Sequence, residues 1–250
     1  MTDVQLVFLF VAAIGAGAVN ALAGGGSILT FPALLAAGLP PVAANITNSV
    51  ALCPGYVGGV FAQRHDLRGQ ARRLVALLPV SAVGGLFGGL LILRGDEGAF
   101  EAVVPWLLVG ACALLAVQGR VRAWLQARTR GSQGLGWAMV PVLPAAIYGG
   151  YFGAGLSVIF LAVLGLTLHD TLTRLNALKQ ALSLAANVAA GMLFMFAPEL
   201  DRPAALTMAG GALIGGALGG RLASKVRPER LRGLVIAVGL AVAILLFVKG

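Results

Sequence analysis

The sequence predicts an all-α polytopic membrane protein made of two inverted repeats, each a glycine-broken re-entrant helical hairpin followed by three transmembrane helices. Three observations predict this fold class: the composition, the length of the apolar segments, and a pattern that recurs in both halves. Of the 250 residues, 59% are hydrophobic and only 11% are charged, with a mean hydropathy of +0.93. Soluble domains carry about 25% charged residues, so this composition excludes them, together with disordered and disulfide-rich secreted proteins.

Six segments have the length of ordinary membrane spans, since a helix needs about 20 mostly apolar residues to cross the hydrocarbon core. These segments are residues 43–63, 74–93, 102–119, 177–196, 203–220 and 231–248. Two longer apolar stretches, 4–37 and 135–166, are interrupted by glycine-rich segments. Each stretch fits either one long span with a defect or a hairpin that enters and leaves on the same side of the membrane.

The placement of the basic residues favours a hairpin at 135–166. If every stretch crossed the membrane, the 18 Lys and Arg residues would divide almost evenly between the two sides. With a hairpin at 135–166, 15 of the 18 gather on one side. Basic loops mark the cytoplasmic side, so we expect a cytoplasmic linker at 121–134 and both termini on the outer side of an inner membrane. Residues 1–63 contain no Lys or Arg, so the same test leaves both alternatives open for 4–37.

A pattern near the start of the chain recurs about 130 residues later, which indicates a duplication. Ala12-Ala13-Ile14 before the first glycine break matches Ala145-Ala146-Ile147 before the second, and a polar segment that starts a span follows each break. We place the two repeats at residues 1–120 and 135–250. A hairpin plus three spans crosses the membrane an odd number of times. If each half is such a hairpin plus three spans, the second repeat inserts upside down relative to the first, as in many secondary transporters.

The two glycine breaks are candidate anion-binding sites. A half-helix that starts inside the membrane presents backbone N–H groups without intrahelical partners and a partial positive charge. Glycine lets a ligand approach the backbone closely, so two half-helix starts from opposite faces would bind an anion. We expect backbone donors at Gly24, Gly25, Gly26, Ser27, Gly153 and Gly155. The alternative is that these glycines only allow close helix packing, as we expect for the other glycine pairs of the chain.

Polar side chains close to the breaks complete the candidate site. They are Asn20, Asn45, Thr47, Asn48, Tyr151, Asn176, Lys179 and Gln180. Most of those in the second half share one helical stripe, which favours the interior of a bundle over lipid. A cation inside an apolar span is costly and usually functional, so we expect Lys179 to supply charge to an anion. The alternatives are hydrogen bonds between helices for the stripe, and snorkelling to the membrane surface for Lys179.

All nine acidic residues fall in expected loops or at the ends of spans, which argues against a cation as the substrate. The sequence contains no motif for a catalytic nucleophile, a metal site or a nucleotide, so we expect no enzyme activity, no metal and no cofactor. No basic segment is large enough to form a nucleic-acid-binding domain. The expected partners are the lipid bilayer and a small anion, and a homo-oligomer remains open.

Residues 20–32 (NALAGGGSILTFP) resemble the glycine-rich hallmark of the sulfite exporter TauE/SafE family. Residues 38–48 continue the resemblance, as do the second-half segments 149–155 and 174–179, although Gly153-Ala154-Gly155 departs from a triple glycine. The resemblance covers essentially the whole chain. It implies an inner-membrane transporter of bacteria or archaea that moves sulfite, thiosulfate, organosulfonates or related small anions. The hypothesis is export by alternating access, and the alternative is a membrane scaffold or accessory subunit without transport of its own.

Overall fold

The computed structural model describes residues 1–22, 25–127, 135–222 and 228–249. These residues form ten helices and no strand, which confirms the all-α prediction. The helices of the first half are α1 (Asp3–Leu22), α2 (Ser27–Ala36), α3 (Pro41–Ala62), α4 (Ala71–Arg94) and α5 (Glu97–Ala127). Those of the second half are α6 (Leu135–Tyr151), α7 (Leu156–Thr167), α8 (Leu172–Phe194), α9 (Arg202–Leu222) and α10 (Pro228–Lys249).

Four helices of the described ranges are long and apolar enough to cross a membrane. They contain the segments Asp3–Asn20, Ala71–Arg94, Glu97–Leu125 and Leu172–Phe194. α3 has the length of a span with its 22 residues, but polar side chains such as Asn45 and Asn48 lower its hydropathy. α1 is long enough to cross on its own, whereas its partner α2 has only 10 residues.

Both predicted glycine interruptions are breaks between helices. In the first break, between α1 and α2, Gly25 has a φ of 99°. In the second, residues 152–155 separate α6 from α7, with Gly153 at 75° and Gly155 at 78°. Residues with a side chain rarely adopt such angles, so glycine is what allows the chain to turn between the two helices of each pair. Gly24 lies outside the described residues.

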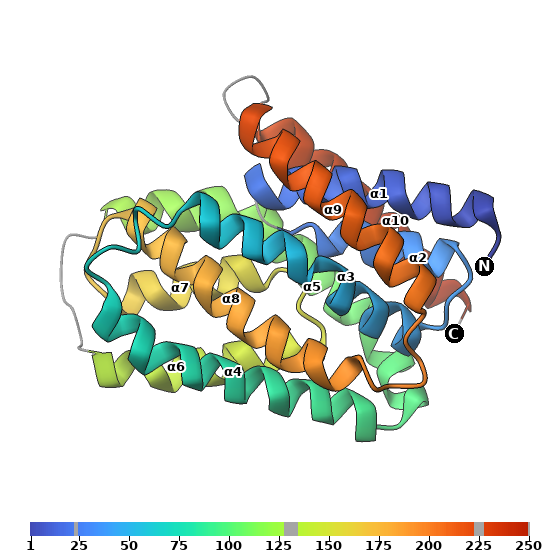
Figure 1. Cartoon of the computed structure of the whole chain (residues 1–250), viewed down its shortest axis with the longest axis horizontal. Helices are drawn as coiled ribbons and strands as arrows, with labels where there is room; N and C mark the ends of the chain where they lie inside the picture. The colour runs from blue at the N-terminus through green and yellow to red at the C-terminus, as the bar shows by residue number, and fades with distance from the viewer. Residues whose placement is uncertain (23–24, 128–134, 223–227, 250) are drawn as a thin grey trace.

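Connections between the helices gather at two opposite ends of the molecule (Figure 1). Both chain termini lie at one end, together with the α2–α3, α4–α5 and α8–α9 connections. We call the other end, with the α3–α4 and α7–α8 connections, the basic end, because Arg64, Arg68, Arg73 and Arg174 belong to it. α6 starts at the basic end and α7 returns to it. α1 starts at the end that holds both chain termini, which we call the terminal end, and α2 returns to that end. The two broken helix pairs thus enter the bundle from opposite ends.

The two halves of the chain interlock through matching helix pairs. α1 packs along α9, and α6 packs along α4, so each pair joins the first helix of one half to the fourth helix of the other. Glycine allows both contacts. A Cβ atom on Gly215 would lie 2.0 Å from the Ile14 carbonyl oxygen, and one on Gly88 would lie 2.0 Å from that of Ile147. Since Ile14 and Ile147 are matching positions of the Ala-Ala-Ile pattern, the repeated sequence corresponds to repeated packing.

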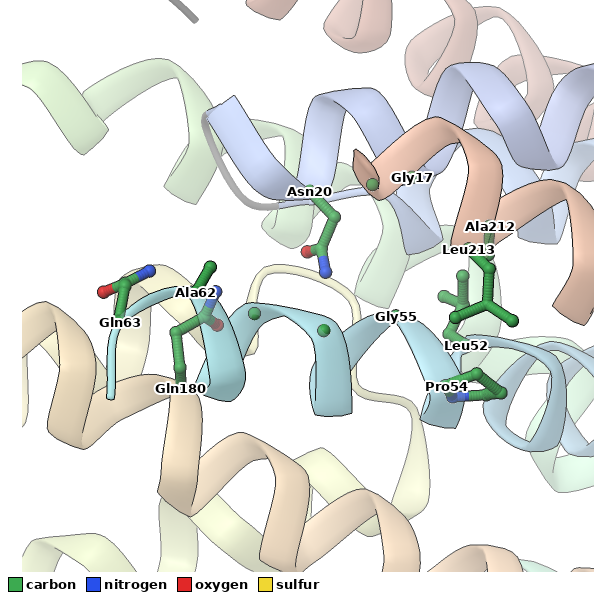
Figure 2. Close-up of a pocket in the computed structure, with 13 residues that line it drawn as sticks. Gly17, Asn20, Leu52, Pro54, Gly55, Ala62, Gln63, Gln180, Ala212 and Leu213 are labelled. Carbon is green, nitrogen blue, oxygen red and sulfur yellow. The ribbon is translucent and has the colours of Figure 1, made fainter. Parts of the chain in front are cut away.

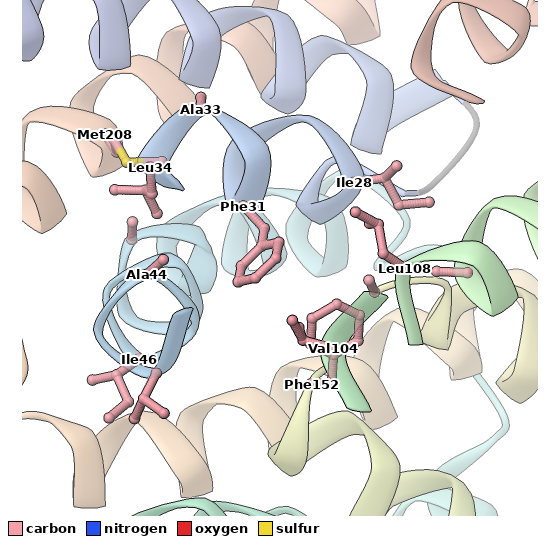
Figure 3. Close-up of a cluster of buried hydrophobic side chains, with 14 of the residues drawn as sticks. Ile28, Phe31, Ala33, Leu34, Ala44, Ile46, Val104, Leu108, Phe152 and Met208 are labelled. Atoms are coloured by element: carbon pink, nitrogen blue, oxygen red, sulfur yellow. The ribbon is translucent and has the colours of Figure 1, made fainter. Parts of the chain in front are cut away.

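An apolar cluster joins the two breaks at the centre of the bundle (Figure 3). Phe31 of α2 lies edge to face against Phe152 of the second break, with ring centroids 5.3 Å apart and ring planes at 82°. Val104 and Leu108 of α5 belong to the same cluster and are fully buried. Edge-to-face aromatic pairs contribute about 0.5–1.5 kcal/mol beyond the burial of their area, so this pair helps to hold the two broken helix pairs together.

α5 is longer than the span predicted at 102–119. It runs from Glu97 to Ala127, and the linker predicted at 121–134 therefore begins as helix. Residues 120–127 contain neither glycine nor proline, and most of their side chains have good helix propensity, so nothing stops the helix at the end of the apolar run.

Candidate functional site

A cavity of about 410 Å³ lies between α1, α3, α8 and α9 (Figure 2). Small-molecule sites usually occupy about 300–1,000 Å³, so this space is large enough for a substrate. We call it the α3–α9 cavity. Its lining residues are Gly17, Asn20, Leu52, Pro54, Gly55, Gly58, Gly59, Ala62, Gln63, Gln180, Ala212, Leu213 and Gly216.

The cavity exists because α3 and α9 present glycine where side chains would otherwise meet. A Cβ atom on Gly55, Gly58 or Gly216 would have no heavy atom within 4 Å among its surroundings. The corresponding helices of the other half, α8 and α4, are in direct contact: a Cβ on Gly85 would lie 2.2 Å from the Ala186 carbonyl oxygen. The cavity therefore occupies the place at which the matching helix pair touches.

The cavity is polar at one end and apolar at the other (Figure 2). Asn20 of α1, Gln63 at the end of α3 and Gln180 of α8 bring three amide side chains to the polar end. Gln180 is buried, and its Nε2 atom lies 2.8 Å from the position that a Cβ of Gly59 would take. Gly59 thus makes room for this amide. The lining residues include no charged side chain.

Lys179 lies behind the polar end rather than in the lining. Lys179 is only 3% exposed, and its Nζ donates a hydrogen bond of 2.8 Å to Asn176 Oδ1. Asn176 Nδ2 donates in turn to Gln63 Oε1 at 2.8 Å. Two hydrogen bonds therefore connect a buried ammonium group to an amide of the lining. Because the Gln63 oxygen accepts from Asn176, the group that Gln63 can offer to a ligand is its NH2.

The polar residues at the start of α3 lie deeper in the bundle. Asn45 Nδ2 donates to the Tyr151 carbonyl oxygen at 2.8 Å, and Thr47 Oγ1 accepts a 3.1 Å hydrogen bond from a backbone N–H of the α8–α9 connection. Asn48 is buried one helical turn from Leu52, on the face of α3 that lines the cavity. Its Oδ1 has no hydrogen-bond partner in the part of the chain that the structure describes. Of the polar residues at the start of α3, Asn48 is thus the one that continues the cavity face.

The glycine breaks do not line the cavity in the described parts of the chain. At the first break, the N–H groups of residues 28–30 donate to the carbonyl oxygens of residues 25–26, and Ser27 is buried at the start of α2. At the second break, the first N–H groups of α7 donate to the carbonyl oxygens of Gly153 and Gly155. Of the predicted backbone donors that the structure describes, none belongs to the lining of the cavity, and all lie at the two turns; they are Gly25, Gly26, Ser27, Gly153 and Gly155.

Both breaks rest against the same level of α5. A Cβ atom on Gly25 would lie 3.4 Å from the Leu115 side chain, and one on Gly155 would lie 3.3 Å from Ala111 Cα. Leu115 and Ala111 are one helical turn apart and fully buried. Both breaks therefore lie beside apolar α5 side chains inside the bundle.

Two features of the cavity were not predicted from the sequence: Gln63 and the small-residue face of α3. Gln63 closes the predicted span 43–63 beside an arginine, where a polar residue is ordinary. Gly55, Gly58, Gly59 and Ala62 follow helical spacing and share one face, which was the available signal. Only the approach of a second helix shows whether such a face packs closely or lines a cavity.

An ionic cluster links the two halves at the basic end. Asp170 accepts hydrogen bonds from Arg73 of α4 and from Arg174 of α8, the latter at 3.0 Å. Arg174 also donates to the Arg68 carbonyl oxygen at 3.0 Å. Burial by itself raises the pKa of Asp170, but the hydrogen bonds from both arginines outweigh it, so the pKa lies below its ordinary value. The ionised carboxylate therefore connects the start of α4 to the start of α8.

The family described as "Sulfite exporter TauE/SafE" matches residues 9–246, which is nearly the whole chain. The chain belongs to the TauE/SafE family. The resemblance seen in the glycine-rich segments is thereby confirmed.

Curated relatives of this TauE/SafE protein are membrane transporters by name. It is 29% identical to "Probable membrane transporter protein ORF9" of a Sinorhizobium species, over 96% of this chain and 91% of the relative. It is 25% identical to "Probable membrane transporter protein YfcA" of Escherichia coli K12, over 95% and 88% of the two chains. A "Probable membrane transporter protein" of Haemophilus influenzae is 25% identical, over 92% and 90%. No solved structure matches the chain.

As a TauE/SafE protein, the chain is a multi-pass membrane transporter that works in a lipid bilayer on a small-molecule substrate. Within the described ranges, no group of three or more His, Cys, Asp or Glu side chains is placed to hold a metal ion. The α3–α9 cavity is the candidate substrate site, because it combines an apolar wall with a few convergent polar groups.

Proposed function

We propose that this TauE/SafE protein exports small sulfur-containing anions, such as sulfite, thiosulfate or organosulfonates, across the inner membrane by alternating access. The observation that carries the proposal is the lining of the α3–α9 cavity. Asn20, Gln63 and Gln180 bring amide groups to its polar end, and the lining contains no carboxylate. Amide N–H groups suit the oxygens of an oxyanion, whereas a cation would find no counter-charge in the lining.

The direction of transport is argued from charge. Arg64 and Arg68 lie in the α3–α4 connection of the basic end, and Arg73 and Arg174 lie at the starts of α4 and α8. Under the positive-inside rule these arginines support a cytoplasmic location for the basic end, with both termini outside. The polar end of the cavity lies on this side, because Gln63 directly precedes the arginines of the α3–α4 connection. A membrane potential that is negative inside favours anion export by about 2.3 kcal/mol per charge per 100 mV, so export needs no coupling ion.

Alternating access is supported by the difference between the two matching helix pairs. α4 and α8 touch through Gly85 and Ala186, whereas α9 and α3 leave a cavity lined by Gly55, Gly58 and Gly216. Glycine on both faces gives α9 room to approach α3 as closely as α4 approaches α8. In the proposed cycle α9 closes on α3 while α4 separates from α8. Such an exchange is expected for two inverted repeats whose broken helix pairs are re-entrant.

The proposed contacts follow from the cavity lining and from the hydrogen bonds of Asn176. Asn20, Gln63 and Gln180 bind the substrate directly, and Lys179 supplies positive charge through Asn176. Asn48, buried beyond the apolar end of the cavity, would meet the substrate later in the cycle. The backbone donors expected at the glycine breaks remain a prediction for that later conformation.

The test of the function is electrogenic current from purified protein in liposomes. Sulfite, thiosulfate, an alkanesulfonate and chloride are offered in turn, and Gln180→Leu is measured beside the parent protein. We expect current that is selective for the sulfur oxyanions and lower in the variant. Absence of current for every anion, from protein shown to be folded, would argue first for electroneutral coupling and then for a scaffold without transport.

The test of alternating access is thiol labelling at the cavity. Gly58→Cys is introduced after both native cysteines, Cys53 and Cys112, are replaced by alanine. A membrane-impermeant maleimide should label Gly58→Cys from the cytoplasmic side, and a saturating substrate should change the labelling rate. His65→Cys in the exposed α3–α4 connection is the matched control, because it faces the same side and its labelling should not respond to substrate.

A further inference from the structure

The α3–α9 cavity has a second, apolar half that a small inorganic anion would leave empty. Leu52 and Pro54 of α3 and Ala212 and Leu213 of α9 lie together at the end away from the amides (Figure 2). The whole cavity measures about 410 Å³, which corresponds to the volume of roughly fourteen liquid water molecules. Sulfite has only four non-hydrogen atoms, so it would occupy the amide end alone.

We propose that this transporter selects amphipathic organic anions, namely sulfonates with an apolar body of a few carbon atoms, over inorganic sulfur oxyanions. The sulfonate group lies among Asn20, Gln63 and Gln180, and the hydrocarbon body lies against Leu52 and Leu213. This inference rests on the proposed function and adds the specificity of the same site.

Two features of the structure support this orientation of the ligand. The polar groups are confined to one end, so only a ligand with one charged end can satisfy the amides and fill the rest. Leu52 is buried and Leu213 is half exposed, so the apolar wall has one buried side and one open side. This wall lies nearer the middle of α3 than the amide end does, because Leu52 precedes Gln63 by 11 residues, about three helical turns. The charged group would therefore stay at the cytoplasmic end while the apolar body reaches towards Asn48.

A substitution at Gly55 tests this selectivity for the hydrocarbon body. It lies beside Leu52 and Pro54 at the apolar end, and a Cβ atom there would have no heavy atom within 4 Å. A larger side chain can therefore enter the cavity without displacing the backbone. Gly55→Leu should fill the space of the hydrocarbon body and leave the amide end open.

The experiment is a chain-length series of alkanesulfonates from methane to dodecane, measured as competition against transported sulfite in proteoliposomes. Each methylene group buried in the apolar end should tighten competition about fourfold, up to the length that fills the cavity. Longer chains should then compete less well. In Gly55→Leu the gain with chain length should disappear, while methanesulfonate competes as in the parent protein. Gly15→Leu, on an exposed face of α1 outside the cavity, should keep the full series.

The outcomes separate this inference from the proposed function. Sulfite transport without any chain-length dependence, or an equal loss for all chain lengths in Gly55→Leu, would overturn the inference and leave anion transport in place. Competition that keeps rising to dodecanesulfonate would also overturn it, because the apolar end would then be a lipid crevice. If no sulfite or sulfonate is transported by the folded parent protein, the proposed function itself fails.

Discussion

Asn45 of α3 donates a 2.8 Å hydrogen bond to the carbonyl oxygen of Tyr151, the last residue of α6. Because α6 stops there, this carbonyl has no partner within its own helix. A side chain from the first half of the transporter thus satisfies the backbone at the break of the second half. The glycine breaks are held by contacts between the halves as well as by their own turns.

Asn45→Ala should therefore destabilise the protein. Loss of the amide leaves a buried carbonyl unsatisfied, which costs about 1–3 kcal/mol. The matched control is Asn187→Ala, because Asn187 donates to the Ser183 carbonyl oxygen four residues earlier on the same helix. That carbonyl keeps its helical partner, so the loss should be smaller. Thermal unfolding in detergent measures both variants, and equal losses would contradict the role assigned to Asn45.

Gly85 should tolerate no side chain. A Cβ atom there would lie 2.2 Å from the Ala186 carbonyl oxygen, so Gly85→Ala must push α4 away from α8. Gly15→Ala is the control, since a Cβ on Gly15 meets no heavy atom within 4 Å. Replacing a helical glycine by alanine there should be neutral or stabilising by up to about 1 kcal/mol. The yield of monodisperse protein and its unfolding temperature distinguish the two, and a stable Gly85→Ala would show that α4 and α8 are not rigidly packed.

Lys179 should affect transport more than folding. The hydrogen-bond chain through Asn176 to Gln63 brings its charge near the cavity without direct contact. We expect Lys179→Ala to lower anion current about three- to tenfold, which is the effect of removing one net hydrogen bond of about 1 kcal/mol. Arg94→Ala, at an exposed position of the terminal end, should leave the current unchanged. Unchanged current in folded Lys179→Ala would exclude the charge-supplying role.

Acid should weaken the ionic cluster at the basic end. The pKa of Asp170 is lowered in the folded protein, so its contribution to stability is present above the unfolded value of about 3.9. That contribution is lost as the pH falls towards the folded value. Asp170→Asn should lower the unfolding temperature above pH ~4, and the difference from the parent should shrink as the pH falls from there towards the folded pKa. Asp3→Asn, at the exposed start of α1, should give a curve parallel to that of the parent protein.

Much of the helical architecture follows from local sequence features. Apolar length predicts helices that can cross a membrane, and glycine clusters predict both breaks, because helix length and backbone angle are properties of short segments. The extension of α5 to Ala127 was not predicted, since hydropathy falls at Arg120 while helix propensity does not. Hydropathy marks where a helix leaves the lipid, and it does not mark where the helix ends.

The candidate site could be predicted only in part. Asn20 and Gln180 were expected from their polarity within apolar segments, and both line the cavity. Thr47 was expected for the same reason, yet its hydroxyl accepts a backbone N–H of the α8–α9 connection. Polarity inside a span shows that a side chain needs a partner, and it does not tell whether the partner is a substrate or the protein itself.

The sequence by itself determined the membrane class, the positions of both helix breaks, the set of polar side chains inside the spans, and the resemblance to the TauE/SafE family. Tertiary structure alone decided which of these side chains share a cavity. α1, α3, α8 and α9 are far apart in the chain, and their distances depend on the small residues of two facing helices at once. The same glycine spacing gives a tight contact at Gly85 and an open cavity at Gly55, because only the facing helix decides whether the space is filled.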